Sequence, residues 1–345
     1  MALLELSNIT AGYDKNVILR DFNLSVERGE FVSLLGSSGC GKTTCLRLIA
    51  GFADPMAGKI VFDGKDYTHV PLHKRNFGFV FQSYALFPHM TVFDNVAFGL
   101  KMRGVDRQTI RREVLHMLKV VDLAGFENRL PREMSGGQRQ RVALARALVI
   151  KPDLLMFAEP LSNLDAKLRV KMRVEIRRLQ QELGFTAIYV THDQEECFAI
   201  SDKVAIMNQG VIEQMGTPGD IYNNPRTEFI AHFVGFENFF PLTRVGEGCF
   251  AAENGARLRA TSDRAGERFK ACIRPEDVKV FAAGADVPNA VPGRVTVSTF
   301  LGKHIQLNVM TDIGEMVVST DKVFPIGEGV TLSLMENKII LIDQP

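Results

Sequence analysis

The sequence lacks long apolar runs and an excess of charge of either sign. No stretch approaches the roughly 20 apolar residues of a membrane-spanning helix. The start carries an acid at Glu5 and no basic segment before an apolar core, so we expect no signal peptide. Basic residues number 41 and acidic residues 40, a net charge of +1 that gives no support for nucleic-acid binding. These absences predict a cytosolic chain whose contact with any membrane is peripheral.

Cysteine is scarce, and its spacing suggests no cross-links. The chain has five cysteines, an odd number, and none of them forms a C-x-x-C pair. This pattern suits a reducing compartment. Cys40 lies inside a glycine-rich segment, where we favour the role of a plain small residue over that of an oxidation-sensitive thiol.

The central motif of the chain lies at residues 36–44, which read GSSGCGKTT. It fits G-x-x-x-x-G-K-[ST] between an apolar run and a helical pattern, the strand–loop–helix setting that a phosphate-binding loop requires. Glycines let backbone N–H groups turn inward, and the helix start adds unpaired N–H groups and a positive dipole end. Lys42 would neutralise the β- and γ-phosphates of a nucleotide, and the Thr43 hydroxyl would ligate Mg²⁺. We favour this interpretation over a plain glycine-rich turn, with the candidate contacts Gly36, Ser37, Ser38, Gly39, Cys40, Gly41, Lys42, Thr43 and Thr44.

The periodicity of the chain predicts two domains. Strand-like and helix-like segments alternate from residue 31 to 207, which indicates a doubly wound α/β core. The apolar run 154–157 is typical of a strand buried on both faces of a parallel sheet, whereas residues 3–35 alternate in polarity and predict an antiparallel layer. Beyond residue 235, short alternating segments separated by glycine and proline predict a small β-barrel-like domain. We expect the domains at 1–238 and 239–345.

Three other features suggest binding. Tyr13 lies in a turn, where it would either stack on an adenine ring or be a half-buried aromatic. Ser135, within the MSGGQ stretch at 134–138, is well placed to cap a helix whose start implies a second anion site. The apolar segment 87–100 is either core or a docking groove for a partner helix.

Six elements, taken in order, resemble the nucleotide-binding subunits of ATP-binding cassette (ABC) transporters. They are the phosphate loop at 36–43, Gln82, MSGGQ at 134–138, the LLMF strand before Glu159, LSNLD at 161–165, and His192. Six elements in family order and spacing are far more specific than any single one. The resemblance implies an α/β P-loop NTPase with an antiparallel β layer and a helical subdomain at about 88–150, followed by a small all-β, OB-like barrel domain.

The resemblance also implies a role for each site residue. Gln82 senses the γ-phosphate and contacts Mg²⁺ or the attacking water, Glu159 orients or deprotonates that water, and His192 holds the γ-phosphate. Tyr13 stacks on the adenine ring. The helix after residue 134 caps the ATP held by the opposite subunit of a twofold homodimer, and Asp165 crosses the same interface. The residues of that capping helix start are Ser135, Gly136, Gly137 and Gln138.

The C-terminal tract, with IRPED at 273–277, resembles the accessory β domain of importer ATPases for polyamines, ferric iron, phosphonates, sugars and sulfate. The stretch 82–100 most resembles the polyamine and ferric-iron branch and matches the region that receives a coupling helix of the membrane subunits. By this resemblance, the chain binds ATP and Mg²⁺ and powers solute import through two membrane-spanning permease subunits. An extracytoplasmic solute-binding protein acts through them, and the ATPase lies peripherally at the cytoplasmic face of the inner membrane.

Two positions depart from the family pattern. Met134 replaces the usual leucine, a change that conserves volume. Ala158 stands where the family's strand ends in an aspartate that holds Mg²⁺ through water. Alanine removes a hard oxygen ligand and a negative charge, which leaves Thr43, Gln82, the phosphates and water to hold the metal. Our hypothesis is that ATP still binds while turnover falls strongly.

Ala158 keeps a second function open, that of a nucleotide-dependent clamp or regulatory module that binds ATP without turnover. A hydrolysis assay separates the two. A soluble cassette ATPase of DNA repair or translation is disfavoured, because the chain has neither a long coiled-coil insertion nor a second cassette. A metal site at His69 and His73 is also disfavoured, because Pro71 between them argues against a helix.

Overall fold

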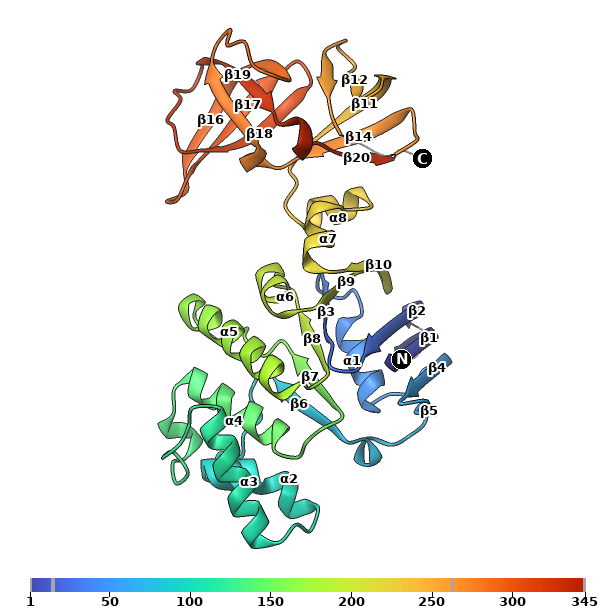
Figure 1. Cartoon of the computed structure of the whole chain (residues 1–345), viewed down its shortest axis with the longest axis vertical. Helices are drawn as coiled ribbons and strands as arrows, with labels where there is room; N and C mark the ends of the chain where they lie inside the picture. The colour runs from blue at the N-terminus through green and yellow to red at the C-terminus, as the bar shows by residue number, and fades with distance from the viewer. Residues whose placement is uncertain (1, 14–15, 262–263, 344–345) are drawn as a thin grey trace. The chain divides into compact units, whose positions relative to one another are not determined.

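The computed structural model describes residues 2–13, 16–261 and 264–343. The chain divides into two compact units between Pro218 and Gly219, and each unit is described by itself. Figure 1 shows the two sheets and the helices of the first unit and the β-rich second unit. None of the helices within the described residues is long and apolar enough to cross a bilayer.

The first unit is built on a six-stranded sheet in the order β10-β9-β3-β8-β7-β6. Its strands are β3 (Phe31–Gly36), β6 (Phe77–Phe81), β7 (Leu154–Ala158), β8 (Ala187–Thr191), β9 (Lys203–Asn208) and β10 (Val211–Gly216). β3 runs parallel to β8 and β9, and β7 runs parallel to β6 and β8, whereas β10 is antiparallel to β9. The carboxyl ends of five strands therefore meet at one edge, where open α/β sheets bind their ligands.

An antiparallel sheet and several helices complete the first unit. The sheet has the order β2-β1-β4-β5, with β1 (Ala2–Tyr13), β2 (Asn16–Glu27), β4 (Ala57–Phe62) and β5 (Lys65–Asp66). The helices are α1 (Lys42–Ala50), α2 (Val92–Met102), α3 (Arg107–Val120), α4 (Gly136–Leu148), α5 (Ala166–Leu183) and α6 (Gln194–Ile200), with the 3₁₀ turns η1 (Leu72–Lys74) and η2 (Pro131–Glu133). This arrangement confirms the expected α/β fold with an antiparallel layer.

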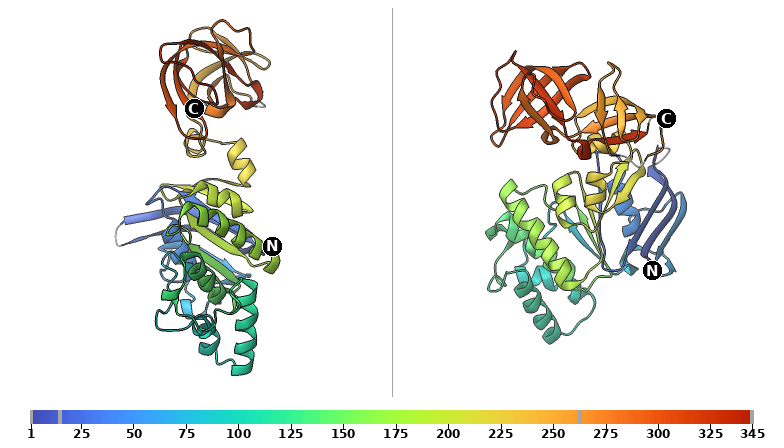
Figure 2. Two further views of the ribbon diagram at one scale, coloured as in Figure 1. Left: turned by 90° about the vertical axis from the view of Figure 1, so that its left-hand side faces the viewer. Right: turned by 45° about the horizontal axis from the view of Figure 1, so that its top comes forward.

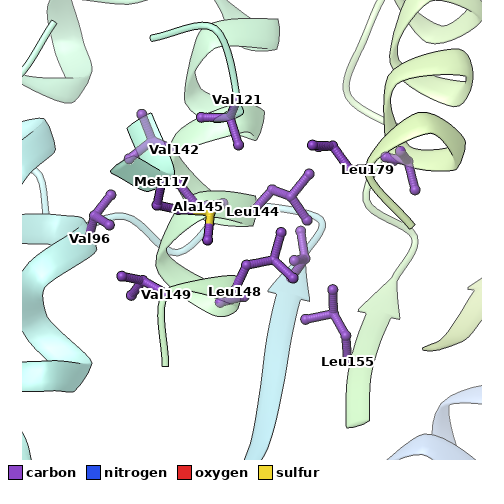
Figure 3. Packing of buried hydrophobic residues seen from close by; sticks show 14 of the residues in the cluster. Val96, Met117, Val121, Val142, Leu144, Ala145, Leu148, Val149, Leu155 and Leu179 are labelled. Atoms are coloured by element: carbon purple, nitrogen blue, oxygen red, sulfur yellow. The ribbon is translucent and has the colours of Figure 1, made fainter. Parts of the chain in front are cut away.

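Strand β7 separates two hydrophobic cores. Leu155 and Phe157 pack with the core that includes residues of α2, α3, α4 and α5. Leu154 and Met156, on the other face, pack with α1 and the antiparallel sheet. Because successive side chains of a strand point to opposite faces, the apolar run 154–157 is buried on both sides, as its sequence predicts. Figure 3 shows Leu155 beside the helical core.

Helices α2, α3 and α4 pack against one another within the region expected at about 88–150. Each begins at a side chain that accepts a backbone N–H, namely Thr91, Asp106 and Ser135. Such caps satisfy N–H groups that have no partner inside the helix. The cluster core, shown in Figure 3, includes Val96, Met117, Val121, Val142, Leu144, Ala145, Leu148 and Val149.

The second unit is all-β apart from short helices, as expected. One sheet has the order β13-β12-β11-β14-β20 and the other the order β15-β19-β16-β17-β18, and both enclose a single core. The strands are β11 (Asn238–Gly246), β12 (Cys249–Ala251), β13 (Arg257–Arg259), β14 (Arg268–Ile273), β15 (Val278–Ala282), β16 (Ala290–Phe300), β17 (Ile305–Thr311), β18 (Gly314–Thr320), β19 (Gly329–Leu334) and β20 (Ile340–Asp343). The helices are α7 (Pro218–Asn223) and α8 (Glu228–Phe233), with η3 (Pro275–Asp277) and η4 (Glu336–Lys338). The right-hand view of Figure 2 separates the two sheets.

The compact units divide earlier than the expected boundary at 238/239, because α7 and α8 are held by the β strands. Arg274, which follows β14, is 5% exposed and donates from Nη2 to the carbonyl oxygens of Tyr222 (2.7 Å) and Val234 (3.2 Å). Its guanidinium lies 3.4 Å from the ring centroid of Tyr222 and 4.0 Å from that of Phe236. A cation held between aromatic rings is stabilised by their quadrupoles. The helices therefore belong with the second unit.

Candidate nucleotide-binding site

Four of the expected site segments follow neighbouring strands at one edge of the parallel sheet. The glycine-rich loop follows β3, Gln82 follows β6, Glu159 follows β7 and His192 follows β8. β7 lies between β6 and β8, with Ala158 in register with both Phe81 and Val190. Long-range strand pairing therefore brings together residues that lie far apart in the sequence.

The loop after β3 has the backbone form of an anion receptor. Gly41 has φ 107° at the N-cap of α1, a conformation that favours glycine, and no side chain caps the helix. The first N–H groups of α1 therefore remain available to an anion. A Cβ at Gly36 would collide with the carbonyl oxygen of Met207 and with the Cys40 sulfur, so this glycine lets the loop lie close to β9.

Lys42 is buried beneath this loop. Its Nζ donates to the carbonyl oxygens of Gly36 (2.7 Å) and Ser37 (2.8 Å) and lies 3.6 Å from the Cys40 sulfur. The Lys42 amine is thus held at the loop by two neutral carbonyl oxygens. Cys40 is 4% exposed and packs as a small buried residue.

Two cavities open beside the loop. One of about 340 Å³ is lined by Thr43, Leu46, Phe81, Gln82, Ser83, Ala158, Glu159, Asn163 and Val190. The other, of about 420 Å³, is lined by Tyr13, Thr43, Leu46, Arg47, Phe52, Ala53, Phe79, Phe81 and Ala158. Thr43, Leu46, Phe81 and Ala158 line both, so the start of α1 and the ends of β6 and β7 form their common wall. Each is large enough for part of a small ligand.

Tyr13 lies at the rim of the second cavity. Tyr13 is 43% exposed, and its hydroxyl accepts a hydrogen bond of 3.0 Å from Nη1 of Arg47. This bond lowers the pKa of the Tyr13 phenol. The hydroxyl is therefore fixed while a ring face stays accessible, as stacking on a base requires.

Glu159 and His192 lie side by side. The Oε2 atom of Glu159 is 3.3 Å from Nδ1 of His192 and accepts from the Ser162 hydroxyl at 3.4 Å. Glu159 has φ 46°, which non-glycine residues seldom adopt, and its N–H donates to the carbonyl oxygen of Val190. This hydrogen bond to Val190 at the sheet edge holds the strained backbone of Glu159 in place. Strained backbone conformations are common at functional sites. Glu159 lines the first cavity, whereas His192 is not among the residues that line either cavity and is brought to the site by its contact with Glu159.

Ala158 leaves the shared wall of the cavities without a carboxylate. In the described residues, no group of three or more His, Cys, Asp or Glu side chains could hold a metal ion. The oxygen donors that line the first cavity are the hydroxyls of Thr43 and Ser83, the amides of Gln82 and Asn163, and Glu159. Mg²⁺ prefers oxygen ligands and is often held by substrate phosphates, one or two carboxylates and water. The residues present therefore fit the ion, with Glu159 as the one carboxylate in the lining of this cavity.

Comparison with known proteins agrees with this geometry. A family model described as ABC transporter matches residues 19–162, and one described as TOBE domain matches residues 271–342. A spermidine/putrescine import ATP-binding protein of Mesoplasma florum is 47% identical over 317 residues, which are 90% of this chain and 88% of the relative. The chain belongs to the ATP-binding subunits of ABC transporters.

Other relatives extend the match over almost the whole chain. A Fe(3+) ions import ATP-binding protein of Rhizobium etli is 45% identical over 344 residues, 97% of this chain and 96% of the relative. A solved structure of cbiO1 from Clostridium perfringens, part of the ABC transporter complex cbiONQ, matches with a TM-score of 0.61 at 29% identity. That match covers 65% of this chain and 91% of the other. As a member of this family, the chain is an ATP-binding ATPase subunit.

The signature segment of this ABC subunit is ordered by its own helix. Ser135 and Gln138 exchange hydrogen bonds, since each backbone N–H donates to the other side chain, at 2.9 and 3.3 Å. A Cβ at Gly136 or Gly137 would lie about 3 Å from Leu164 or Leu168 respectively, so the segment packs against the start of α5. None of these four signature residues lines either cavity beside the phosphate loop.

Asp165 has a local task in the structure. Its Oδ1 accepts the N–H of Leu168 at 2.9 Å and so caps α5. This contact lies within the chain and is independent of any partner. The start of α5 is thus fixed beside the signature segment.

A buried network behind His192 was missed by the sequence analysis. Glu196, on α6, accepts hydrogen bonds from Tyr189 and Thr191 on β8. The signal was present as D-x-x-E at 193–196, a capping pattern in which Asp193 accepts the N–H of Glu196. Burial of the carboxylate, however, depends on how β8, α5 and α6 pack, which the sequence alone does not show.

Proposed function

We propose that this ABC subunit is the motor of a solute importer, which closes as a homodimer on ATP and opens after hydrolysis. The observation that carries the proposal is the cavity at the sheet edge, where Thr43, Gln82 and Glu159 face the same space beside the Lys42 loop. This set provides donors for phosphate and metal and an acceptor for the proton of water. ATP would favour the closed state, and hydrolysis would remove that preference.

Each residue has a distinct task in the proposed reaction. Lys42 exchanges its two carbonyl partners for phosphate oxygens, and Tyr13 stacks on the base. Glu159 accepts the proton of the attacking water, and His192, 3.3 Å away, holds the γ-phosphate. Bound Mg²⁺, held by Thr43, by Gln82 and by the phosphates, supplies charge neutralisation at the γ-phosphate.

The signature segment supports a shared site. Ser135 and Gln138 cap their own helix, and the segment lines neither cavity of its own chain. We infer that Ser135, Gly136, Gly137 and Gln138 contact the ATP of a second copy, across an interface that Asp165 also reaches. A twofold interface of this kind closes on itself and gives two equivalent sites.

Ala158 supports slow turnover. It leaves Mg²⁺ without the aspartate that would hold the ion through water, while every polyphosphate contact remains. The same observation favours a second function, a nucleotide-dependent clamp that binds ATP without turning over. The two differ only in hydrolysis, since both predict ATP-driven dimerisation.

The segment 82–100 has the form of a docking surface for the permease subunits. Asn95 is fully buried, and its amide donates to the carbonyl oxygens of Phe87, Met90 and Thr91, which organises the loop before α2. Around it, Gln82, Pro88 and His89 are exposed and Phe87 is partly exposed. We infer that this loop receives a helix of a membrane subunit, which places the chain peripherally at the cytoplasmic face of the inner membrane.

The relatives favour polyamines or ferric iron as the solute. Separate permeases and an extracytoplasmic solute-binding protein would select it, so the ATPase need not contact it. Uptake of labelled putrescine, spermidine or ferric iron is the direct test, in cells whose own ATP-binding subunit has been deleted and replaced by this chain. Uptake of none of these solutes would contradict the assignment.

Mixing two defective chains tests the shared site. Lys42→Ala removes the phosphate cation, and Ser135→Arg blocks the signature contact, so neither variant alone should dimerise on ATP. The mixture forms one intact site from the phosphate loop of one chain and the signature of the other, and should regain ATP-dependent dimers in light scattering. Circular dichroism checks that Ser135→Arg keeps its helices. A mixture that stays monomeric contradicts the shared site.

A further inference from the structure

The segment that carries His192 is held in place by the buried carboxylate of Glu196, which has no role of its own in the proposed reaction. Glu196 is 2% exposed, and its Oε2 accepts from the Tyr189 hydroxyl at 2.9 Å and from the Thr191 hydroxyl at 2.8 Å. A buried charge is costly unless it is hydrogen-bonded, and both partners meet that need. Burial is the main cause that raises the pKa of Glu196, and its two hydroxyl partners oppose that rise.

The direction of the hydrogen bonds around His192 is fixed by chemistry. The N–H of Asp193 can only donate, and it donates to the Thr191 hydroxyl oxygen at 3.0 Å. The hydroxyl hydrogen of Thr191 is therefore free to go to Glu196. The chain Asp193 N–H to Thr191 to Glu196 spans His192, and the Glu196 N–H closes the ring by donating to Asp193 Oδ1 at 3.1 Å.

The outer side of the same ring is held by helix α5. Oδ2 of Asp193 lies 3.1 Å from Nη2 of Arg173 and 3.4 Å from Nη1 of Arg169. Arg173, 8% exposed, also pairs with Glu195 at 2.9 Å. Both neighbours of His192 in the chain are thus fixed, whereas the imidazole itself is exposed and reaches Glu159.

We propose that Glu196 is a positioning residue: through the Thr191 hydroxyl, its carboxylate fixes the backbone on both sides of His192 and so aims the imidazole at the γ-phosphate. The inference rests on the proposed γ-phosphate contact of His192. We call the two hydrogen bonds from Asp193 N–H to Thr191 and from Thr191 to Glu196 the bracket. ADP has no γ-phosphate, so loss of the bracket weakens ATP binding and spares ADP binding. The ratio of ATP affinity to ADP affinity therefore reports the orientation of the His192 imidazole rather than overall stability. Measuring this ratio does not require hydrolysis.

The network offers a matched pair of variants. Thr191→Val keeps the shape of the side chain and removes the bracket, whereas Tyr189→Phe removes one hydrogen bond to the same Glu196 oxygen and leaves the bracket intact. Equilibrium binding of ATP and ADP is measured for the full chain by calorimetry. We expect Thr191→Val to lower the ATP/ADP affinity ratio about tenfold, as loss of a hydrogen bond to a charged group does. Tyr189→Phe should leave the ratio within about twofold, and Thr191→Ser, which restores the hydroxyl, should keep it.

His192→Ala separates failure of the inference from failure of the proposed function. If His192→Ala lowers the ratio and Thr191→Val does not, the positioning role is wrong while the γ-phosphate contact stands. If His192→Ala leaves the ratio unchanged, the contact itself is wrong and the positioning role falls with it. Equal losses in Thr191→Val and Tyr189→Phe would mean that the network acts through stability alone. Should Thr191→Val not fold, Glu196→Gln replaces it, with a loss expected between those of Tyr189→Phe and His192→Ala.

Discussion

The ends of two neighbouring strands, β7 and β8, are built in opposite ways. β8 ends at Thr191 and is followed by His192, and this segment is held by a buried carboxylate and by arginines of α5. β7 ends in Ala158, which lies between Phe81 and Val190 and has no polar side-chain atom. The strand end proposed to hold phosphate is thus supported by hydrogen bonds, while the strand end proposed to lie at the metal presents no carboxylate. We therefore expect ATP binding and ATP turnover to depend on different strand ends.

The largest expected effect combines both strand ends. If Ala158→Asp restores turnover, adding Glu159→Gln should abolish it, since loss of a general base costs about 10²- to 10⁴-fold. ATP affinity should stay close to that of the single variant, because the loop of Lys42 is untouched. Hydrolysis and ATP binding are measured on both proteins. Ser162→Ala, which removes only the 3.4 Å hydroxyl contact to Glu159, serves as the control and should retain most of the activity.

Removal of the metal should affect the natural chain less than its Ala158→Asp variant. With an aspartate at position 158, loss of Mg²⁺ leaves a carboxylate facing phosphates of the same sign, which disfavours binding. Chelation with EDTA should lower ATP affinity about 10- to 100-fold in Ala158→Asp, because repulsion between like charges near a protein surface amounts to a few kcal/mol. The natural chain and Ala158→Asn should change by only about threefold, because neither presents a charge at that position. Equal losses in all three proteins would show that position 158 does not hold the metal.

The smallest expected effect is the pH dependence that Glu196 adds to stability. Its folded-state pKa is raised, so above the ordinary glutamate pKa the folded chain still holds a proton that the unfolded chain has lost. Stability from this group is therefore present at lower pH and is lost as pH rises through the raised pKa. The groups facing it are Tyr189 and Thr191 from β8, Asp193 from the loop and Arg173 from α5.

Denaturant unfolding of the natural chain and of Glu196→Gln, at a series of pH values, measures this contribution. Because glutamine does not titrate, the stability of the natural chain relative to the variant should fall as pH rises from the ordinary glutamate pKa through the raised pKa of Glu196. A difference that is constant or rises with pH would mean that Glu196 is not buried as the structure has it.

Local pattern and long-range packing account for what the sequence did and did not predict. The loop at 36–44 was predictable, because its glycines, the strand before it and the helix after it are contiguous. Its neighbours Gln82 and Glu159 could be grouped only through the order of strands in a parallel sheet, or through resemblance. The buried network of Glu196 was missed, because a carboxylate in D-x-x-E looks like an ordinary helix start until the strand covers it.

The division between the two compact units precedes the expected domain boundary at 238/239 for a similar reason. The loss of helical periodicity after residue 235 marks where strands begin, whereas compactness is decided by contacts. Arg274 reaches back across the sequence to Tyr222 and Val234 and thereby adds two helices to the β unit. The local composition of α7 and α8 gives no indication of that contact.

The most direct test of the account is MgATP hydrolysis by the natural chain beside Ala158→Asp and Ala158→Asn, with ATP-dependent dimerisation recorded on the same samples. We expect all three proteins to dimerise on ATP and only Ala158→Asp to turn over appreciably, about 10- to 100-fold faster than the other two. The asparagine variant matches the aspartate in shape and lacks its charge. Equal hydrolysis by the natural chain and Ala158→Asp would contradict the account, because the metal would then be held without a carboxylate at the end of β7.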